Sequence, residues 1–79
     1  MMKLEIISAH EVSFSGEVTS VTLPGEVGQF TVLKDHAPII SVLVKGTVKY
    51  TDAKGNPGSF EIAGGLADVN NNVISVCVY

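Results

Sequence analysis

Two histidines and one cysteine are the side chains of this 79-residue chain best suited to acid–base or nucleophilic chemistry near neutral pH. Asp35 directly precedes His36, and a carboxylate that orients an imidazole can create a general base. Adjacent residues of an extended chain point to opposite sides, however, so these two side chains need not touch. We therefore favour a structural or interface role for His36 over catalysis, and we expect His10 to be exposed to solvent.

Metal and nucleotide sites lack the residues they need. Two histidines without a clustered third ligand do not form a zinc site. The single thiol, Cys77, cannot form an intramolecular disulfide, and its place in an alternating strand pattern favours a small core or interface residue over a reactive thiol. Gly25 and Gly28 match neither GxGxxG nor GxxxxGK[ST], so we interpret their loop as a turn. We expect no cofactor and no catalytic site.

Lys54 is the basis of an alternative function. Lipoyl and biotinyl carrier domains are β-sandwiches of similar size that present a lysine at a hairpin tip. Their lysine stands in a Met-Lys-Met or Asp-Lys-Ala frame, whereas here it stands between Ala53 and Gly55, among ordinary turn formers. A carrier domain modified at Lys54 is therefore the second hypothesis, and a small enzyme that uses Asp35 and His36 is the third.

Composition and charge exclude several classes of protein. The net charge is −3 and all five basic residues are lysines, so the chain lacks the arginine-rich stripe of a nucleic-acid surface. Apolar residues make up 46% of the chain, which is too many for a disordered protein. No apolar run approaches the roughly 20 residues of a membrane span, and the N-terminus does not resemble a signal peptide. We expect a soluble, cytoplasmic chain.

Period-2 alternation predicts an all-β fold. Valine, isoleucine and threonine supply 12, 6 and 5 residues, and β-branched side chains favour strands. Alternating segments are separated by glycine, asparagine and proline, and Gly16 is expected to break or bulge one of them. The pattern predicts a two-sheet β-sandwich of about ten short strands, in one domain over residues 1–79. The principal expected strands are 4–7, 12–15, 17–23, 30–33, 39–44, 47–51, 59–62, 66–69 and 73–79.

Two hairpins are predicted within this sandwich. The turn formers of 52–58 join strands 47–51 and 59–62, whose inward residues should be Val48, Tyr50, Phe60 and Ile62. Three asparagines at 70–72 join the last two strands, because asparagine tolerates the positive φ of tight turns.

Strands 39–44 and 73–79 are apolar on both faces. Central strands covered on two sides would account for this pattern, and so would a surface patch that binds a protein partner. A chain this short, without a disulfide or a metal, draws little stability from its core, and that favours a partner.

Four short motifs occur in an order and spacing that are specific when taken together. They are Gly16–Gly25 (GEVTSVTLPG) with the loop through Gly28, His36–Ile40 (HAPII), Gly46–Val48 (GTV) and Gly64–Val69 (GGLADV). In this arrangement, which covers essentially the whole chain, the sequence resembles the N-terminal domain of the epsilon subunit of F-type ATP synthase. The resemblance implies a β-sandwich of two five-stranded sheets and a non-catalytic rotor subunit of the central stalk.

The resemblance also implies partners and a location. Such a subunit binds the gamma subunit and the c-ring and couples proton translocation to ATP synthesis, peripheral to the cytoplasmic face of the bacterial inner (plasma) membrane. Carried over by position, the c-ring side would be Glu26, Val27, Gly28 and Gln29. The gamma side would be Ser8, His36, Ala37, Pro38 and Ser41.

Three departures from the family pattern stand out. Gln29 occupies a position where the family usually has glutamate, so a charge-assisted contact to the c-ring would become neutral. Lys34 and Asp35 stand where the family often has Pro-Gly. Most epsilon subunits continue into a regulatory helical hairpin, whereas this sequence stops at Tyr79. We therefore expect no hairpin, no inhibitory switch and no nucleotide site in this polypeptide; the lack of tag and linker residues favours a naturally short subunit over a trimmed one.

Overall fold

The computed structural model describes residues 2–9 and 11–79, so the expectation that His10 is solvent-exposed falls outside the described residues. The predicted all-β sandwich is confirmed, with eight strands in the described part in place of about ten. None of the described residues belongs to a helix long and apolar enough to cross a membrane. The strands are β1 (Met2–Ser8), β2 (Glu11–Gly25), β3 (Gly28–Leu33), β4 (Ile39–Leu43), β5 (Gly46–Asp52), β6 (Pro57–Ile62), β7 (Gly65–Asn70) and β8 (Val73–Val78).

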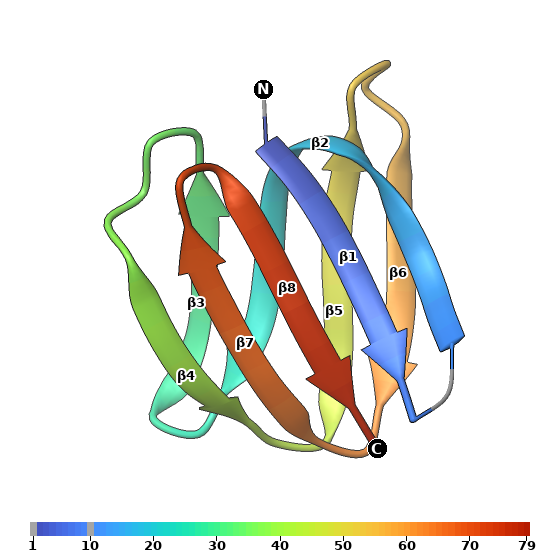
Figure 1. The fold of residues 1–79 in the computed structure, drawn as a ribbon, viewed down its shortest axis with the longest axis vertical. Helices are drawn as coiled ribbons and strands as arrows, with labels where there is room; N and C mark the ends of the chain where they lie inside the picture. The colour runs from blue at the N-terminus through green and yellow to red at the C-terminus, as the bar shows by residue number, and fades with distance from the viewer. Residues whose placement is uncertain (1, 10) are drawn as a thin grey trace.

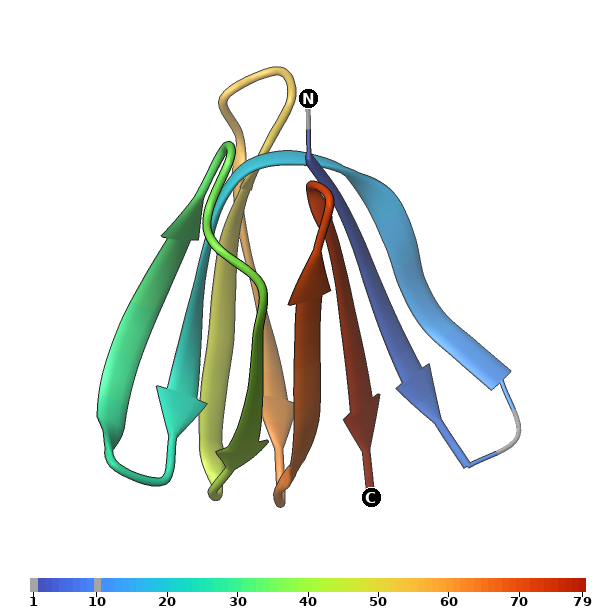
Figure 2. The same cartoon turned by 60° about the vertical axis from the view of Figure 1, so that its left-hand side comes forward.

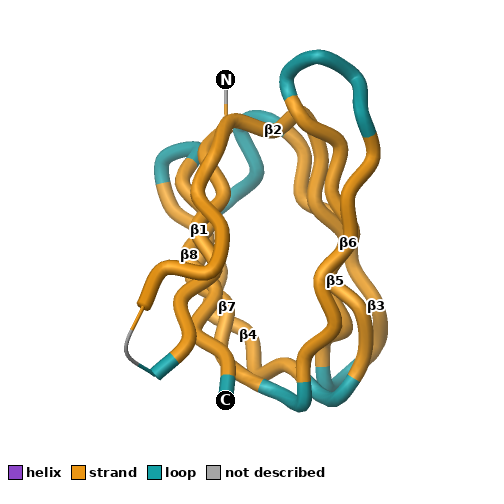
Figure 3. Tube along the Cα trace, turned by 90° about the vertical axis from the view of Figure 1, so that its right-hand side faces the viewer, coloured by secondary structure: helices purple, strands orange, loops and turns teal. Residues whose placement is uncertain are grey.

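The strands form two layers that share β2 (Figure 1; Figure 3). In the β1 layer, the order is β4, β7, β8, β1 and the first half of β2; β1 and β8 are parallel and the other pairs antiparallel. In the β5 layer, the second half of β2 lies between β3 and β5, and β6 follows β5. Because one strand belongs to both layers, the two sheets are joined along the backbone as well as through the core.

The lower strand count comes from β2, which does not stop at Gly16. Its pairing with β5 shifts register between Val18 and Ser20, so Thr19 is an extra residue in a β-bulge. There the strand curves over from the β1 layer to the β5 layer (Figure 2). The bulge also changes the phase of the alternation, so Val18 and Val21 are both buried. Strict alternation over the expected strand 17–23 would place Val18 and Val21 on opposite faces, so the bulge is the reason that both point inward.

The core between the layers is entirely apolar in the described part of the chain. The predicted inward residues Val48 and Ile62 are buried, and Tyr50 and Phe60 pack against the core, as expected. The Tyr50 ring lies 4.5 Å from that of Phe14 on β2, measured between centroids. Each fully buried aliphatic side chain stabilises the fold by about 1.5–3 kcal/mol. The buried set is Met2, Leu4, Ile6, Val18, Val21, Leu23, Val32, Leu43, Val48, Ile62, Ala67, Val69, Ile74 and Val76.

Both predicted hairpins are present, and their turns use the expected side chains. Asn71 and Asn72 form a two-residue turn between β7 and β8 with φ values of 50° and 61°. Between β5 and β6, Oδ1 of Asp52 accepts the backbone N–H groups of Asn56 at 2.8 Å and Lys54 at 2.9 Å. The bond from Asn56 is the main reason that the pKa of Asp52 lies below its ordinary value of 3.8.

Gly65 provides a test of how closely β7 and β8 pack. A Cβ at this position would stand 2.2 Å from the backbone carbonyl oxygen of Cys77, whereas a Cβ at Gly16 would meet only the Phe14 ring, at 3.2 Å. We expect Gly65→Ala to lower the free energy of unfolding by about 2 kcal/mol or more, because backbone must move. Gly16→Ala should change it by less than about 1 kcal/mol. Urea unfolding measures both values, and equal effects would contradict this packing.

The Asp52 turn should contribute to the acid sensitivity of the fold. The pKa of Asp52 is lower in the folded chain than in the unfolded chain, so the ionised carboxylate stabilises the fold at pH values above its ordinary pKa. This contribution is lost as the pH falls through the pKa of the folded state. Asp52→Asn should therefore lower the Tm at about pH 7, and the difference from wild type should shrink towards about pH 2. Thermal unfolding across this range checks the prediction. A difference independent of pH would contradict it.

Candidate protein-interaction surface

The Asp35–His36 pair does not form a catalytic dyad. Oδ1 of Asp35 accepts a hydrogen bond from Nδ2 of Asn72 at 3.0 Å. Nδ1 of His36 lies 2.7 Å from the carbonyl oxygen of Ala37, which can only accept, so this contact places a proton on Nδ1. The carboxylate thus holds a neighbouring turn, and the imidazole is oriented by its own backbone. The geometry supports a structural or interface role for His36.

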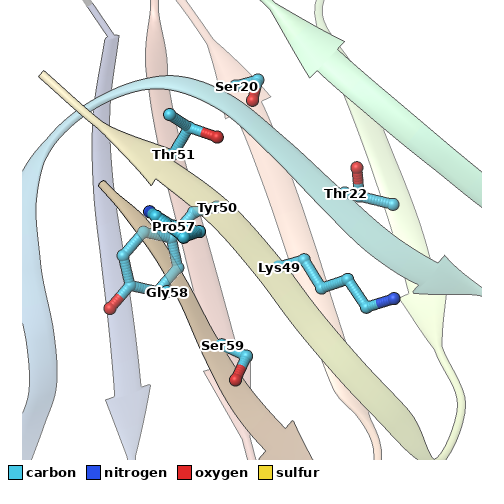
Figure 4. A pocket seen from close by; sticks show the side chains of 8 residues that line it. All are labelled: Ser20, Thr22, Lys49, Tyr50, Thr51, Pro57, Gly58 and Ser59. Carbon is cyan, nitrogen blue, oxygen red and sulfur yellow. The ribbon is translucent and has the colours of Figure 1, made fainter. Parts of the chain in front are cut away.

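Other chemical sites are equally poorly supported in the described residues. Over 2–9 and 11–79, no three His, Cys, Asp or Glu side chains gather closely enough to hold a metal ion. A hollow of about 430 Å³ lies against β2, β5 and β6 (Figure 4). Its lining is mainly hydroxyl-bearing, without a carboxylate, imidazole or thiol: Ser20, Thr22, Lys49, Tyr50, Thr51, Pro57, Gly58 and Ser59. This set offers no general acid–base pair.

The outer face of the β5 layer is mainly polar in this region, with Leu33, opposite Ser20, as an exposed apolar exception. Thr22 and Thr31 on neighbouring strands pair through their hydroxyl groups at 2.9 Å. Lys49 stands opposite Thr22 on one side and Ser59 on the other. Small hydroxyl groups and a lysine are well solvated in water, so this part of the face does not require a covering partner.

The outer face of the β1 layer has the opposite character. Strand register aligns one apolar residue from each of its five strands: Val42, Leu66, Cys77, Ile7 and Val12. We call this set the apolar row. Val42, Leu66 and Val12 remain 49%, 44% and 55% exposed, Cys77 is exposed and Ile7 is half-buried. Ile40 on the same face of β4 is 69% exposed. Such a continuous apolar strip is typical of a protein interface.

The two strands that the sequence predicted to be apolar on both faces, 39–44 and 73–79, have different environments in the structure. β8 is central, between β1 and β7. β4 pairs with β7 along its length but with β2 only at Leu43, so it is close to an edge strand. Leu43 faces the core, whereas Ile40, Val42 and Val44 are exposed, as expected for a patch. Alternation within single strands did not identify Ile7, Val12 and Leu66, because only the register across strands aligns them.

The residues proposed for the c-ring side form a tight hairpin tip. Gly25 pairs with Gly28, so Glu26 and Val27 are the two turn residues between β2 and β3. The side chain of Val27 is fully exposed, and Gly28 has a φ of 137° that other residues rarely adopt. The N–H of Glu26 donates to the carbonyl oxygen of Val42 at 2.9 Å, which fastens the tip to β4. Gln29 is exposed at the start of β3.

The residues proposed for the gamma side do not cluster. His36, Ala37 and Pro38 form the corner between β3 and β4, and Ser41 follows on β4. Ser8 ends β1, which β7 and β8 separate from β4, and it lies at the opposite end of the layer from the corner (Figure 1). Its hydroxyl group is 3.0 Å from that of Ser13. A partner that touched both Ser8 and the corner would cross the outer face that carries the apolar row.

Comparison with known proteins identifies relatives along the whole chain. The family described as ATP synthase, delta/epsilon chain, beta-sandwich domain matches residues 1–79. The ATP synthase epsilon chain of Bordetella petrii is 39% identical over 75 residues, which are 95% of this chain and 53% of that protein. That of Chlorobium limicola is 41% identical over 70 residues, 89% of this chain and 80% of the relative. The chain thus spans about half of the first bacterial relative and most of the second.

Solved structures show the same fold. A chain of the Euglena gracilis mitochondrial ATP synthase, from a structure of its OSCP, F1 and c-ring, superposes with a TM-score of 0.91 at 24% identity. The match covers 98% of this chain and 49% of the Euglena chain. A chain of the Tetrahymena thermophila mitochondrial ATP synthase, from a structure of its central stalk and c-ring, superposes with a TM-score of 0.79 at 17% identity. The match covers 98% of this chain and 62% of the Tetrahymena chain. These identities support the fold alone.

Family membership decides between the two leading hypotheses. Lys54 is exposed in the turn between β5 and β6, but the carrier hypothesis gains no support from relatives such as those of Bordetella petrii and Chlorobium limicola, which are described as ATP synthase epsilon chains. The family matches residues 1–79, and the observed fold agrees with the β-sandwich of its description. This chain therefore belongs to the delta/epsilon family of ATP synthase subunits, of which it contains the β-sandwich domain.

Proposed function

We propose that this chain is a non-catalytic rotor subunit of the central stalk of an F-type ATP synthase. It binds the gamma subunit and the c-ring and couples proton translocation to ATP synthesis. The observation that carries this proposal is the family match over residues 1–79. The two solved relatives, from structures of the F1/c-ring assembly and of the central stalk with its c-ring, favour the same assignment.

The apolar row is the surface on which the gamma subunit packs in this proposal. Burial of apolar side chains drives association, and Val42, Leu66 and Val12 are the largest exposed groups of the row.

The gamma-side residues carried over from the family lie apart in the same layer. Ser8 is at one end and the 36–38 corner at the other, whereas Ser41 lies within β4 opposite the buried Ala67, on the core-facing side of the strand. The row passes through Ile7, next to Ser8, and runs along that end of the layer to Val42. A gamma subunit that contacts Ser8 and extends across the layer covers the row, while the hydroxyl-bearing part of the β5 layer stays in water.

The hairpin tip of residues 26–29 meets the c-ring in this proposal. Its two-residue turn and its bond to β4 make the tip stiff, and Val27 projects fully into solvent. Gln29 provides a neutral amide, and Glu26 is the one charged side chain of the tip. Held through these two partners, the chain lies peripheral to the cytoplasmic face of the bacterial inner (plasma) membrane. A closely packed sandwich resists shear, which suits a part that transmits rotation.

The proposal is tested with the ATP synthase of the source organism, purified and stripped of its own epsilon subunit. We expect the wild-type chain to bind this complex in a titration followed by gel filtration or interferometry. Val42→Ser combined with Leu66→Ser should weaken the affinity about tenfold or more, because exposed apolar groups at the centre of an interface contribute most of its free energy. Their exposure in the free chain means that the Tm should change little.

Thr22→Ala combined with Ser59→Ala is the matched control on the outer face of the β5 layer. It removes two exposed side-chain hydroxyls and should leave the affinity unchanged. A wild-type chain that does not bind the stripped complex contradicts the proposed function. Equal loss of affinity in the control contradicts the assignment of the β1 layer as the gamma-binding face.

Cys77 supplies an independent prediction, because it lies within the apolar row and its thiol is exposed. A thiol reagent should label it in the folded free chain without denaturant. Binding to the stripped complex should slow the labelling at least about tenfold, because the gamma subunit covers the row. Mass spectrometry of the chain with and without the complex measures both rates. Labelling at the same rate in the bound state would place the interface elsewhere.

A further inference from the structure

Asn72 connects three elements at one end of the sandwich. Its backbone carbonyl accepts the N–H of Lys3 on β1 at 2.9 Å. Its side chain contacts Asp35 in the connection between β3 and β4, which lies beside the β7–β8 turn at the top of Figure 1. The Asp35 N–H donates to Oδ1 of Asn72 at 2.6 Å, and Nδ2 of Asn72 donates to Oδ1 of Asp35 at 3.0 Å. We call this reciprocal contact the Asp35–Asn72 pair.

Both members of the pair have positive φ, 65° at Asp35 and 61° at Asn72. Aspartate and asparagine are the non-glycine residues that adopt this conformation most readily. The pair therefore joins the β3–β4 connection to the β7–β8 turn, through the residue of positive φ in each. Because β3 belongs to the β5 layer and β8 to the β1 layer, the contact ties the end of one sheet to the end of the other.

We propose that Asp35 and Asn72 are positioning residues that hold the corner of residues 36–38 in the conformation that meets the gamma subunit. This inference rests on the proposed function. The corner follows Asp35 directly, and Ala37 and Pro38 are exposed, so core packing does little to hold it. The His36 N–H donates to the carbonyl oxygen of Leu33 at 3.1 Å and closes the turn that the pair anchors. An ordered loop binds with a smaller loss of conformational entropy than a mobile one.

The test exchanges the two side chains. Asn72→Asp places a second carboxylate against Asp35 and removes the amide donor, so both hydrogen bonds of the pair are disturbed. Asp35→Asn combined with Asn72→Asp restores one amide and one carboxylate, and both residue types tolerate positive φ. Asn71→Asp is the matched control: it makes the same charge change in the same turn, at a residue with φ of 50° that makes no side-chain hydrogen bond to Asp35 in the described chain.

The first measurement is hydrogen exchange of the His36 amide in the free chain. Asn72→Asp should accelerate exchange about tenfold, the expected result of losing a hydrogen bond worth about 1–1.5 kcal/mol. The exchanged double variant should return to the wild-type rate, and Asn71→Asp should not depart from it. An unchanged rate in Asn72→Asp, or a double variant as fast as the single one, overturns the proposal.

The second measurement is affinity for the stripped ATP synthase complex, with the Tm of each variant as a check on folding. The affinity should fall about tenfold in Asn72→Asp and recover in the exchanged double variant at an unchanged Tm. Faster exchange with unchanged affinity shows that the corner is held but is not a docking element, which overturns the proposal. Failure of the wild-type chain to bind overturns the proposed function, and the exchange experiment still reports on the pair by itself.

Discussion

The structure depends on one strand that belongs to both sheets. β2 pairs with β1 through its first half and with β3 and β5 through its second half, and the bulge at Thr19 is the point where it changes layer. A bulge bends and twists a strand more strongly than regular pairing allows, so a continuous chain can turn from one sheet into the other without a loop. The same bulge turns both Val18 and Val21 towards the core. Closure of the sandwich and filling of its core are therefore set at one position.

The two outer faces of the sandwich differ in polarity, and therefore in how favourably water solvates them. Hydroxyl groups and a lysine on the β5 layer remain hydrated, and Thr22 and Thr31 also satisfy each other. The apolar row on the β1 layer exposes aliphatic side chains from strands that are distant in sequence. A chain of 79 residues with a single cysteine draws little stability from its small core, so burial of that row in the proposed complex would add to it. In the proposed complex, the outer face of the β1 layer would therefore serve both the stability of the chain and its assembly.

The loops of the sandwich are held by backbone and short side chains rather than by core packing. The tip at Glu26 is fastened to β4, the β5–β6 turn is closed by Asp52, and the corner before Pro38 is tied to the β7–β8 turn through Asp35 and Asn72. In each case the bond joins a turn to itself or to a neighbouring element at the rim. A rim organised in this way presents fixed surfaces at both ends of the sandwich, which suits the proposed position between two partners.

The sequence alone determined the strand-rich class, the two hairpins, the positive φ of the asparagine turn and the inward residues of β5 and β6. These features depend on local alternation and on turn residues, and both can be recognised within a few positions. The ordered motifs also led to the family. Only the tertiary structure decided that β2 continues through Gly16, that Val18 faces inward, that the apolar row crosses five strands and that Asp35 meets Asn72. Alternation states which residues share a face within one strand, but it carries no information about which residues become neighbours across strands. That depends on register, on bulges and on the meeting of loops far apart in the chain.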